Sequence, residues 1–210
     1  MKICGESGEF SGGLKGTYAV CKNSRLEIGD GCESHSLRID IADSRVRIGG
    51  RSVLGSLEIY ARGSEIRIGP EAGFNGYVQV LSHEASRIFI GDNCLFAGGS
   101  LVTTSDMHSI VDADTGVRIN PAQAVEIGDH VWVGQNAYIL KGATIGQGSI
   151  IGAASIVTNM IPAKSLAVGS PARVIRTNVT WRHDLIPCPD DGAKADEERR
   201  KHRGILKWLP

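Results

Sequence analysis

Aromatic side chains, net charge and long apolar runs are all scarce in this chain of 210 residues. Only 5% of the residues are Phe, Trp or Tyr while 41% are hydrophobic, so the core must be built from small and aliphatic side chains. The formal charge is zero, with 23 basic and 23 acidic residues, and no net field draws the protein to nucleic acid or to an anionic membrane. An anionic ligand must therefore be held by a local cluster.

Signals for a membrane, for secretion or for disulfides are also missing. No apolar run approaches the ~20 residues of a membrane span, and the polar, Gly-rich residues 1–16 lack a signal-peptide core. We therefore expect a cytoplasmic protein. The cysteines are odd in number, scattered and free of C-x-x-C pairs, and they are Cys4, Cys21, Cys32, Cys94 and Cys188. This argues against a disulfide framework or a zinc ribbon, and reduced structural thiols are expected.

Glycine, by contrast, is abundant. The chain has 27 Gly, about 13% of its residues, against a typical ~7%. Collagen is excluded, because Gly does not recur at every third position and Pro numbers only 7. Disorder is excluded by the density of Ile, Leu and Val. A Gly surplus of this kind suggests a solenoid built from an internal repeat.

The chain contains such a repeat in two forms. In the first half a phrase recurs about every twenty residues: S-R-L-E-I-G-D at 24–30, S-R-V-R-I-G-G at 44–50, S-E-I-R-I-G-P at 64–70 and S-R-I-F-I-G-D at 86–92, with Q-A-V-E-I-G-D at 123–129 as a fifth copy. In the second half the period is six, and the aliphatic positions are Ile127, Val133, Ile139, Ile145, Ile151 and Val157. Mostly small residues follow four positions later, at Val131, Ala137, Ala143, Ser149, Ser155 and Ile161.

A period of six predicts a parallel β-helix. Six residues turn an α-helix by ~600°, which scatters such positions around it. Six residues can instead form one flat side of a triangular coil, with ~18 residues per coil and coils stacked ~4.8 Å apart. The aliphatic residue then points inward and the small residue fits the corner. Gly follows the aliphatic position where tight turns favour little steric restriction, at Gly128, Gly134, Gly146 and Gly152.

One segment breaks the repeat. Coils running on from Ile90 would place the phrase near residues 108 and 126, so we expect one irregular coil before Ile127. We interpret residues 102–124 as a loop that leaves this coil, and long loops on rigid scaffolds are commonly functional. The loop carries Asp106, His108, Asp112, Asp114 and Arg118, and the next repeat carries His130 and Trp132.

Two of these residues are candidates for chemistry. An imidazole with a pKa near 6.5 can accept and return a proton at neutral pH, so His108 is a candidate general base rather than an exposed bystander. Trp132 must face outward, because the bore is too narrow for an indole. It is therefore either an oligomer contact or the wall of a ligand groove.

Four segments carry a family resemblance: T-S-D-M-H-S-I at 104–110, R-I-N-P at 118–121, V-E-I-G-D-H-V-W-V-G-Q-N-A at 125–137 and V-G-S-P-A-R-V-I at 168–175. They resemble the hexapeptide-repeat O-acetyltransferases, and among these the bacterial capsular-polysaccharide group that includes the polysialic acid O-acetyltransferases. The repeats predict an all-β, parallel β-helix over residues 1–176, and the resemblance, which runs from about residue 60 to 180, implies that it is left-handed. The resemblance also implies a homotrimer with active sites in grooves between neighbouring helices, and acetyl-CoA lying parallel to the helix axis.

The resemblance makes His108 the catalytic base and places Trp132 near the thioester. His108 would take the proton of a sugar hydroxyl as that oxygen attacks acetyl-CoA, and backbone N–H groups near Trp132 would stabilise the oxyanion. Asp106 would orient the imidazole or, with Arg118, bind the acceptor. The expected acceptor is a sugar of a capsule or lipopolysaccharide, with sialic acid as one candidate.

Acetyl-CoA is the expected acetyl donor, and no metal is expected. Its phosphates need local cations, which Lys164, Arg173 and Arg176 offer after the last regular hexad. The full set of expected cofactor contacts is Trp132, Gly134, Ala153, Lys164, Ser170 and Arg173.

Three alternatives stay open. A zinc enzyme of the γ-carbonic anhydrase type could use His83, His108 and His130, although the H-x-x-x-x-H spacing of that family is absent. The others are a non-catalytic β-helix scaffold and an N-acetyltransferase acting on an amino sugar. The repeat ends before Thr177, and we expect residues 177–210 to form a tail, with a short helix at 193–203, that packs outside the β-helix or on a neighbouring subunit.

Overall fold

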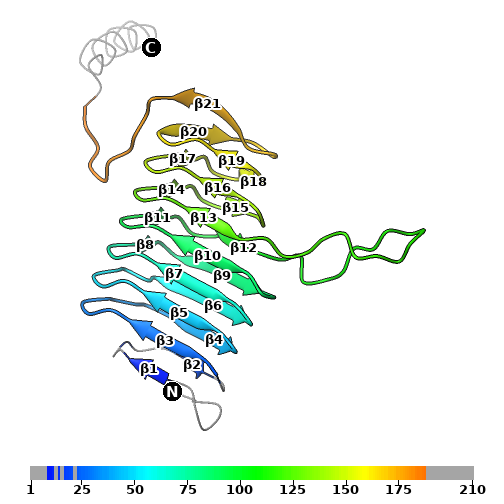
Figure 1. Cartoon of the computed structure of the whole chain (residues 1–210). Helices are drawn as coiled ribbons and strands as arrows, with labels where there is room; N and C mark the ends of the chain where they lie inside the picture. The colour runs from blue at the N-terminus through cyan, green and yellow to red at the C-terminus, as the bar shows by residue number, and fades with distance from the viewer. Residues whose placement is uncertain (1–8, 12–13, 15–16, 21–22, 188–210) are drawn as a thin grey trace, which may run out of the picture.

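The computed structural model describes residues 9–11, 14, 17–20 and 23–187, and it shows a stack of coils with one long protruding loop (Figure 1). Three sheets, here called A, B and C, run along the stack, and the chain visits them in the order B, C, A. Sheet B contains β1 (Glu9–Ser11), β3 (Arg25–Ile28), β5 (Arg45–Ile48), β7 (Glu65–Ile68), β10 (Arg87–Ile90), β13 (Val125–Ile127), β16 (Thr144–Ile145) and β19 (Met160–Ile161).

The other two faces complete the triangle. Sheet A contains β2 (Thr17–Val20), β4 (Arg38–Ala42), β6 (Ser56–Arg62), β9 (Tyr77–His83), β12 (Leu101–Thr103), β15 (Tyr138–Ile139) and β18 (Ile156–Val157). Sheet C contains β8 (Gly73–Phe74), β11 (Leu95–Phe96), β14 (Trp132–Val133), β17 (Ile150–Ile151), β20 (Ser165–Val168) and β21 (Arg173–Thr177). All pairings between the named strands are parallel except that of β20 with β21, so the predicted parallel β-helix is confirmed.

The recurring phrase is one turn of the coil. Its isoleucines are direct neighbours in sheet B, in the register Ile28, Ile48, Ile68, Ile90 and Ile127. The expected irregular coil between the last two is therefore wrong, because β10 pairs directly with β13. The Gly91 amide donates to the Ile127 carbonyl at 2.8 Å, which leaves no room for a coil between them. The extra residues are inserted at the corner between sheets A and B.

The bore is filled as the hexads predict. The six aliphatic positions from Ile127 to Val157 are at most 3% exposed, and the corner positions between them are equally buried. Two rings do enter the bore: Phe74 and Phe96 stack with centroids 5.0 Å apart on successive coils of sheet C. Cys94 is a buried free thiol beside them, and burial raises its pKa to about 11, which keeps it protonated and unreactive.

Tight turns were expected to explain the glycines that follow the aliphatic positions, but the structure gives a different explanation for them. Turn conformation is not their requirement, since none of the four has a positive φ. Instead the coils approach too closely for a side chain: a Cβ at Gly134 would lie 2.7 Å from the Ala153 nitrogen, and one at Gly146 would lie 2.3 Å from the Ala163 nitrogen. These glycines therefore allow the coils to stack.

The last described residues leave the repeat, as expected. Strand β21 folds back on β20, and residues 178–187 then run along the outside, where Trp181 packs with 6% exposure. The expected helix at 193–203 and Cys4, Cys21 and Cys188 lie outside the described residues. In the part of the chain that is described, no helix is long and apolar enough to span a membrane.

Candidate functional site

Backbone hydrogen bonds join the two ends of the protruding loop to each other and to the coil. The Thr104 amide donates to the Leu81 carbonyl at 3.2 Å, and the Gln123 amide donates to the Thr104 carbonyl at 3.0 Å. Residues 103–105 are buried, so the excursion is narrower than the expected 102–124 and leaves the coil only after Ser105. Beyond this base the loop forms a narrow hairpin with an antiparallel bridge between Val111 and Arg118.

Asn120 holds the backbone around His108. This side chain is only 6% exposed, and its Nδ2 donates to the His108 carbonyl at 2.8 Å and to Asp106 Oδ2 at 2.7 Å. Its Oδ1 accepts from the Ile110 amide at 2.7 Å. A buried amide with this many partners fixes one local geometry, because leaving any partner unpaired is costly. The sequence analysis missed Asn120, and its only signal was the R-I-N-P segment.

His108 itself is exposed on this fixed backbone. The imidazole forms no hydrogen bond with the described residues, so it is available to an added molecule. Its neighbour Met107 has φ 61°, in the left-handed region that non-Gly residues seldom adopt, and the Met107 amide donates to Ser105 Oγ at 3.0 Å.

Asp106 does not contact the imidazole. Its Oδ2 accepts hydrogen bonds from Lys141 Nζ and from Asn120, and these donors, Lys141 first, lower the pKa of the carboxyl group. Asp106 is therefore ionised and linked to His108 only through Asn120. Lys141, on the next coil at the same corner, is a second residue that sequence reasoning did not find.

Arg118 ties the loop to the coil below it. Its guanidinium donates to both carboxylate oxygens of Glu84, at 2.9 and 2.8 Å, and to the Asn120 carbonyl at 3.1 Å. The hydrogen bonds from Arg118 and then Ser105 lower the pKa of Glu84 to about 2. Arg118, expected to bind the acceptor, is thus engaged in anchoring the loop.

Trp132 faces outward with 39% exposure, as predicted. It lies on sheet C beside Trp181, with ring centroids 6.1 Å apart, and Trp181 stacks on His130 at 4.3 Å. Trp181 Nε1 also donates to the His130 carbonyl at 2.8 Å. A groove of about 530 Å³ runs over this face, lined by both tryptophans and by Arg51 and Arg182. The sequence analysis did not single out Trp181, although it is one of only three Trp.

A single chain does not bring His108 and Trp132 together. The loop with His108 leaves the corner between sheets A and B, whereas Trp132 lies on the outer face of sheet C (Figure 1). The two features that sequence reasoning placed in one site therefore lie on different faces of the β-helix.

The expected cofactor residues divide into two groups. Gly134, Ala153 and Ser170 follow strands of sheet C on successive coils and line its corner with sheet A, where the Gly134 and Ala153 backbones are in close contact. Arg173 begins β21 next to them. Lys164 lies apart, at the corner between sheets B and C, where its carbonyl accepts from the Val179 amide at 3.0 Å.

The three histidines of the zinc alternative are not gathered. His130 lies at the corner between sheets B and C, its ring nitrogens 3.2 Å from Asn93 Nδ2 and 3.1 Å from the Trp181 carbonyl. His83 ends β9 on sheet A and is half-buried, and burial lowers its pKa. Within the described ranges, no three His, Cys, Asp or Glu side chains are grouped so that they could hold a metal ion.

Comparison with known proteins identifies the repeat. Residues 124–159 match the family "Bacterial transferase hexapeptide (six repeats)". This segment of the chain is therefore similar to the hexapeptide-repeat transferases. The fold of the chain is shared with the solved polysialic acid O-acetyltransferases OatWY and NeuO, at TM-scores of 0.71 and 0.61 and 24% identity, over 92% of this chain and 93% and 98% of theirs. The β-helix is therefore of the left-handed hexapeptide kind.

Two curated proteins with named activities are similar to parts of this chain. A polysialic acid O-acetyltransferase of Escherichia coli O1:K1 is 36% identical over 136 residues, which are 65% of this chain and 44% of that protein. One from Neisseria meningitidis is 39% identical over 59 residues, 28% of this chain and 26% of that protein. The chain thus spans less than half the length of the curated relatives that it matches.

Proposed function

We propose that this protein is an acetyl-CoA-dependent O-acetyltransferase that acts in the cytoplasm on a sugar hydroxyl of a bacterial surface polysaccharide, with sialic acid as the first candidate. The observation that carries this proposal is the presentation of His108: an exposed imidazole on a backbone fixed by the buried Asn120. The relatives are named as polysialic acid O-acetyltransferases, and these names support acetyl as the transferred group and a polysaccharide as the acceptor. A hexapeptide-fold N-acyltransferase of Bacillus cereus solved with coenzyme A, 17% identical with a TM-score of 0.58 over 86% of this chain and 91% of that one, fits a CoA-based donor.

The chemistry needs a single base. As the sugar hydroxyl oxygen attacks the thioester carbon, His108 takes the hydroxyl proton, and the C–S bond then breaks. The imidazolium returns that proton to the departing thiolate, so the products are the acetyl ester and CoA. No Ser or Cys nucleophile is required, because the thioester is already activated. Asp106 and Asn120 hold the base in place and do not themselves exchange protons.

The donor is proposed to lie along the corner between sheets C and A. Small residues at Gly134, Ala153 and Ser170 leave a track parallel to the helix axis, and Arg173 offers a cation for a phosphate at its end. Lys164, at another corner, would meet this donor only through a different copy. Trp132 would cover the reactive end of the thiol arm.

The separation of His108 from Trp132 favours a site shared between copies. Because one chain holds the two side chains on different faces, an active site that uses both needs the loop of one subunit beside sheet C of the next. Heterologous contacts of this kind form closed rings when the rotation closes, and the ring proposed here is a homotrimer.

The test is acetyl transfer by the His108→Ala variant. We expect transfer from acetyl-CoA to polysialic acid to fall by about three orders of magnitude or more, in line with loss of a general base and its positioning. CoA binding measured by calorimetry should be retained. His35→Ala, at an exposed histidine on an N-terminal coil, is the matched control and should be fully active. Near-normal turnover by His108→Ala would refute the assignment, and exclusive acetylation of amines would make the protein an N-acetyltransferase.

A further inference from the structure

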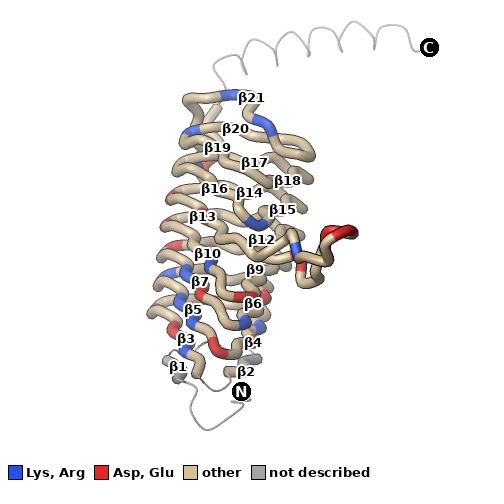
Figure 2. The backbone as a smooth tube through the Cα atoms, turned by 45° about the vertical axis from the view of Figure 1, so that its right-hand side comes forward, with Lys and Arg blue, Asp and Glu red and all other residues tan. Residues whose placement is uncertain are grey.

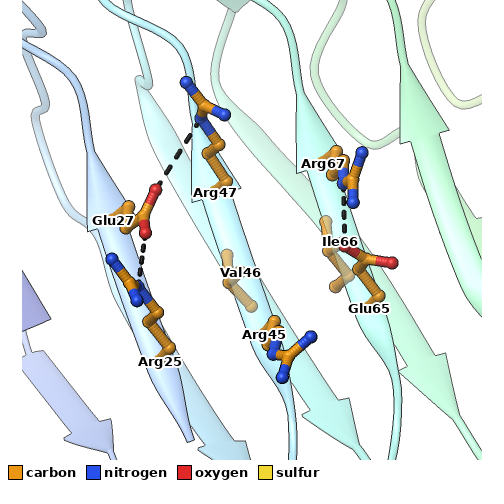
Figure 3. A pocket seen from close by; sticks show the side chains of 8 residues that line it. All are labelled: Arg25, Glu27, Arg45, Val46, Arg47, Glu65, Ile66 and Arg67. Carbon is orange, nitrogen blue, oxygen red and sulfur yellow. Dashed lines mark hydrogen bonds and ion pairs between the residues drawn. The ribbon is translucent and has the colours of Figure 1, made fainter. Parts of the chain in front are cut away.

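The outer face of sheet B carries two columns of charged side chains in strict register. One column runs Arg25, Arg45, Glu65, Arg87 and the other runs Glu27, Arg47, Arg67, Phe89, Glu126. Five arginines thus face three glutamates over β3 to β13, on a protein with no net charge. Figure 3 shows the central part, where the guanidinium groups of neighbouring strands surround a hollow of about 370 Å³. We call this surface the arginine ladder.

The three glutamates of the ladder form ion pairs with some of its arginines and leave others with weak ion pairs or none. Glu65 pairs with Arg67 at 2.7 Å and Glu126 pairs with Arg87 at 3.1 Å, while Glu27 pairs with Arg25. Arg47 reaches Glu27 only at 3.8 Å, and Arg45 has no ion pair with the described residues (Figure 3). Both arginines are exposed. The middle of the ladder therefore holds two guanidinium groups whose donors are largely unused.

The ladder starts where the loop ends. The chain returns from the loop directly into β13, whose neighbour β10 is the first full rung of the ladder. Rungs in a sheet repeat every ~4.8 Å, so the four rungs from β10 to β3 extend ~15 Å away from the loop. Figure 2 shows basic and acidic residues interspersed along the backbone of this N-terminal half of the stack. A polymer with one unit at His108 can thus continue along sheet B.

The ladder face is also the face least suited to contact between copies. On sheet C the in-register outward residues are apolar, namely Leu95, Trp132, Ile150 and Leu166. Charged residues are depleted from the buried centres of interfaces, so sheet C is the better surface for a second copy and sheet B stays open to a soluble ligand.

We propose that the arginine ladder binds the acceptor as a polyanionic polysaccharide, with Arg45 and Arg47 each taking a carboxylate of a sugar unit. The inference rests on the proposed function and specifies its substrate as a carboxylate-bearing polymer rather than a single sugar. Guanidinium groups match carboxylates in charge and in their paired N–H geometry. Arg45 and Arg47 both lie on the outer face of β5, so they offer two neighbouring cations to carboxylates that repeat along a chain.

The experiment is direct binding, without acetyl-CoA, of fluorescent polysialic acid to the full chain. The double variant Arg45→Gln/Arg47→Gln should raise the dissociation constant about tenfold or more, as expected for two lost charge-assisted contacts. Added salt should weaken binding to the parent protein and do so less for the variant. Arg38→Gln/Arg62→Gln removes the same charge from sheet A and should bind like the parent.

Three other outcomes would overturn the ladder proposal: no binding by the parent protein, equal loss in both double variants, or equal competition by single-stranded DNA, which would indicate a general polyanion surface. The acetyl-transfer assay separates this proposal from the proposed function. If the ladder variant acetylates a sialic acid monomer normally but has a raised KM for the polymer, both proposals hold. If the parent protein binds the polymer yet transfers no acetyl group, only the proposed function fails.

Discussion

At the scale of single residues, Asn120 is the side chain that holds the backbone around His108, and Asp106 is linked to that backbone through Asn120. Asn120 accepts from the amide two residues after His108 and donates to the His108 carbonyl, so it fixes the path of the chain on which the imidazole is carried. It also joins Asp106 to this network. A base displaced by about 1 Å can lose ~10²-fold in rate, which makes Asn120 a positioning residue of the first importance.

Replacing Asn120 with Ala should therefore lower kcat without weakening donor binding. We expect a drop of roughly 10- to 100-fold in kcat, from imprecise placement of His108, and a KM for acetyl-CoA within about twofold of the parent value. Asp114→Ala, in the exposed tip of the same loop, is the control and should have parental kinetics. Unchanged kcat in Asn120→Ala would show that the loop holds His108 by other means.

At the scale of elements, the serine that opens each phrase explains how coils of twenty residues are tied together. Ser24, Ser44 and Ser64 are buried at the corner between sheets A and B. The Ser64 amide donates to Ser44 Oγ at 3.1 Å, and the Ser44 amide donates to Ser24 Oγ at 3.3 Å. Where the loop is inserted, Ser86, which opens the next phrase, donates from its Oγ to Thr104 Oγ1 at 2.8 Å. The loop therefore leaves from a corner that is already hydrogen-bonded.

The anchor of the loop should be sensitive to acid. Because Arg118 and Ser105 lower the pKa of Glu84 to about 2, this ion pair favours the anchored loop fully above the ordinary carboxyl pKa of ~4.3. The contribution is lost as the pH falls from that value toward about 2. Hydrogen exchange of a peptide covering residues 106–119, corrected for intrinsic rates, should thus rise over this interval.

Glu84→Gln supplies the control for that experiment. The amide cannot form the charged pair with Arg118, so the loop peptide should exchange faster at pH 7 and show little further change on acidification. Glu71→Gln, at an exposed pair with Arg51 on another corner, should leave loop exchange unaltered. Equal exchange in the Glu84 variant and the parent would mean that the ion pair does not anchor the loop.

At the scale of the whole molecule, the main consequence is that the two residues of the proposed site, His108 and Trp132, lie on different faces. They are held by the same rigid stack, so flexing one chain cannot join them. A β-helix closed by continuous ladders has few ways to bend, so the proposed site needs a second copy of the chain if it uses both residues.

Mixed oligomers test this division. His108→Ala and Trp132→Ala chains should each be nearly inactive alone. If a site takes its imidazole from one subunit and its indole from the next, random co-assembly of equal amounts should restore about a quarter of parental activity, since each partner is intact half the time. The readout is acetyl transfer by the whole population of co-expressed oligomers, without selection for mixed ones. No recovery above the two separate variants would show that His108 and Trp132 do not complete one site between subunits.

The sequence by itself determined the coil. Every sixth residue must be aliphatic to fill a narrow bore, and this one-dimensional rule appears directly in the spacing from Ile127 to Val157. The sequence also located the loop, because an insertion into a solenoid interrupts the period of its repeat. It singled out His108 and the outward Trp132 as well. These features depend on local spacing, which a sequence displays.

Only the tertiary structure decided how residues distant in sequence meet. The direct pairing of Ile90 with Ile127, the anchoring of Arg118 on Glu84 and the packing of Trp181 on His130 join residues 37, 34 and 51 positions apart. Such contacts depend on which corner and which coil each residue occupies, and charged or aromatic side chains have several partners of suitable chemistry in the sequence. The stacking of the coils determines which of these partners each side chain meets, and it also places His108 and Trp132 on different faces.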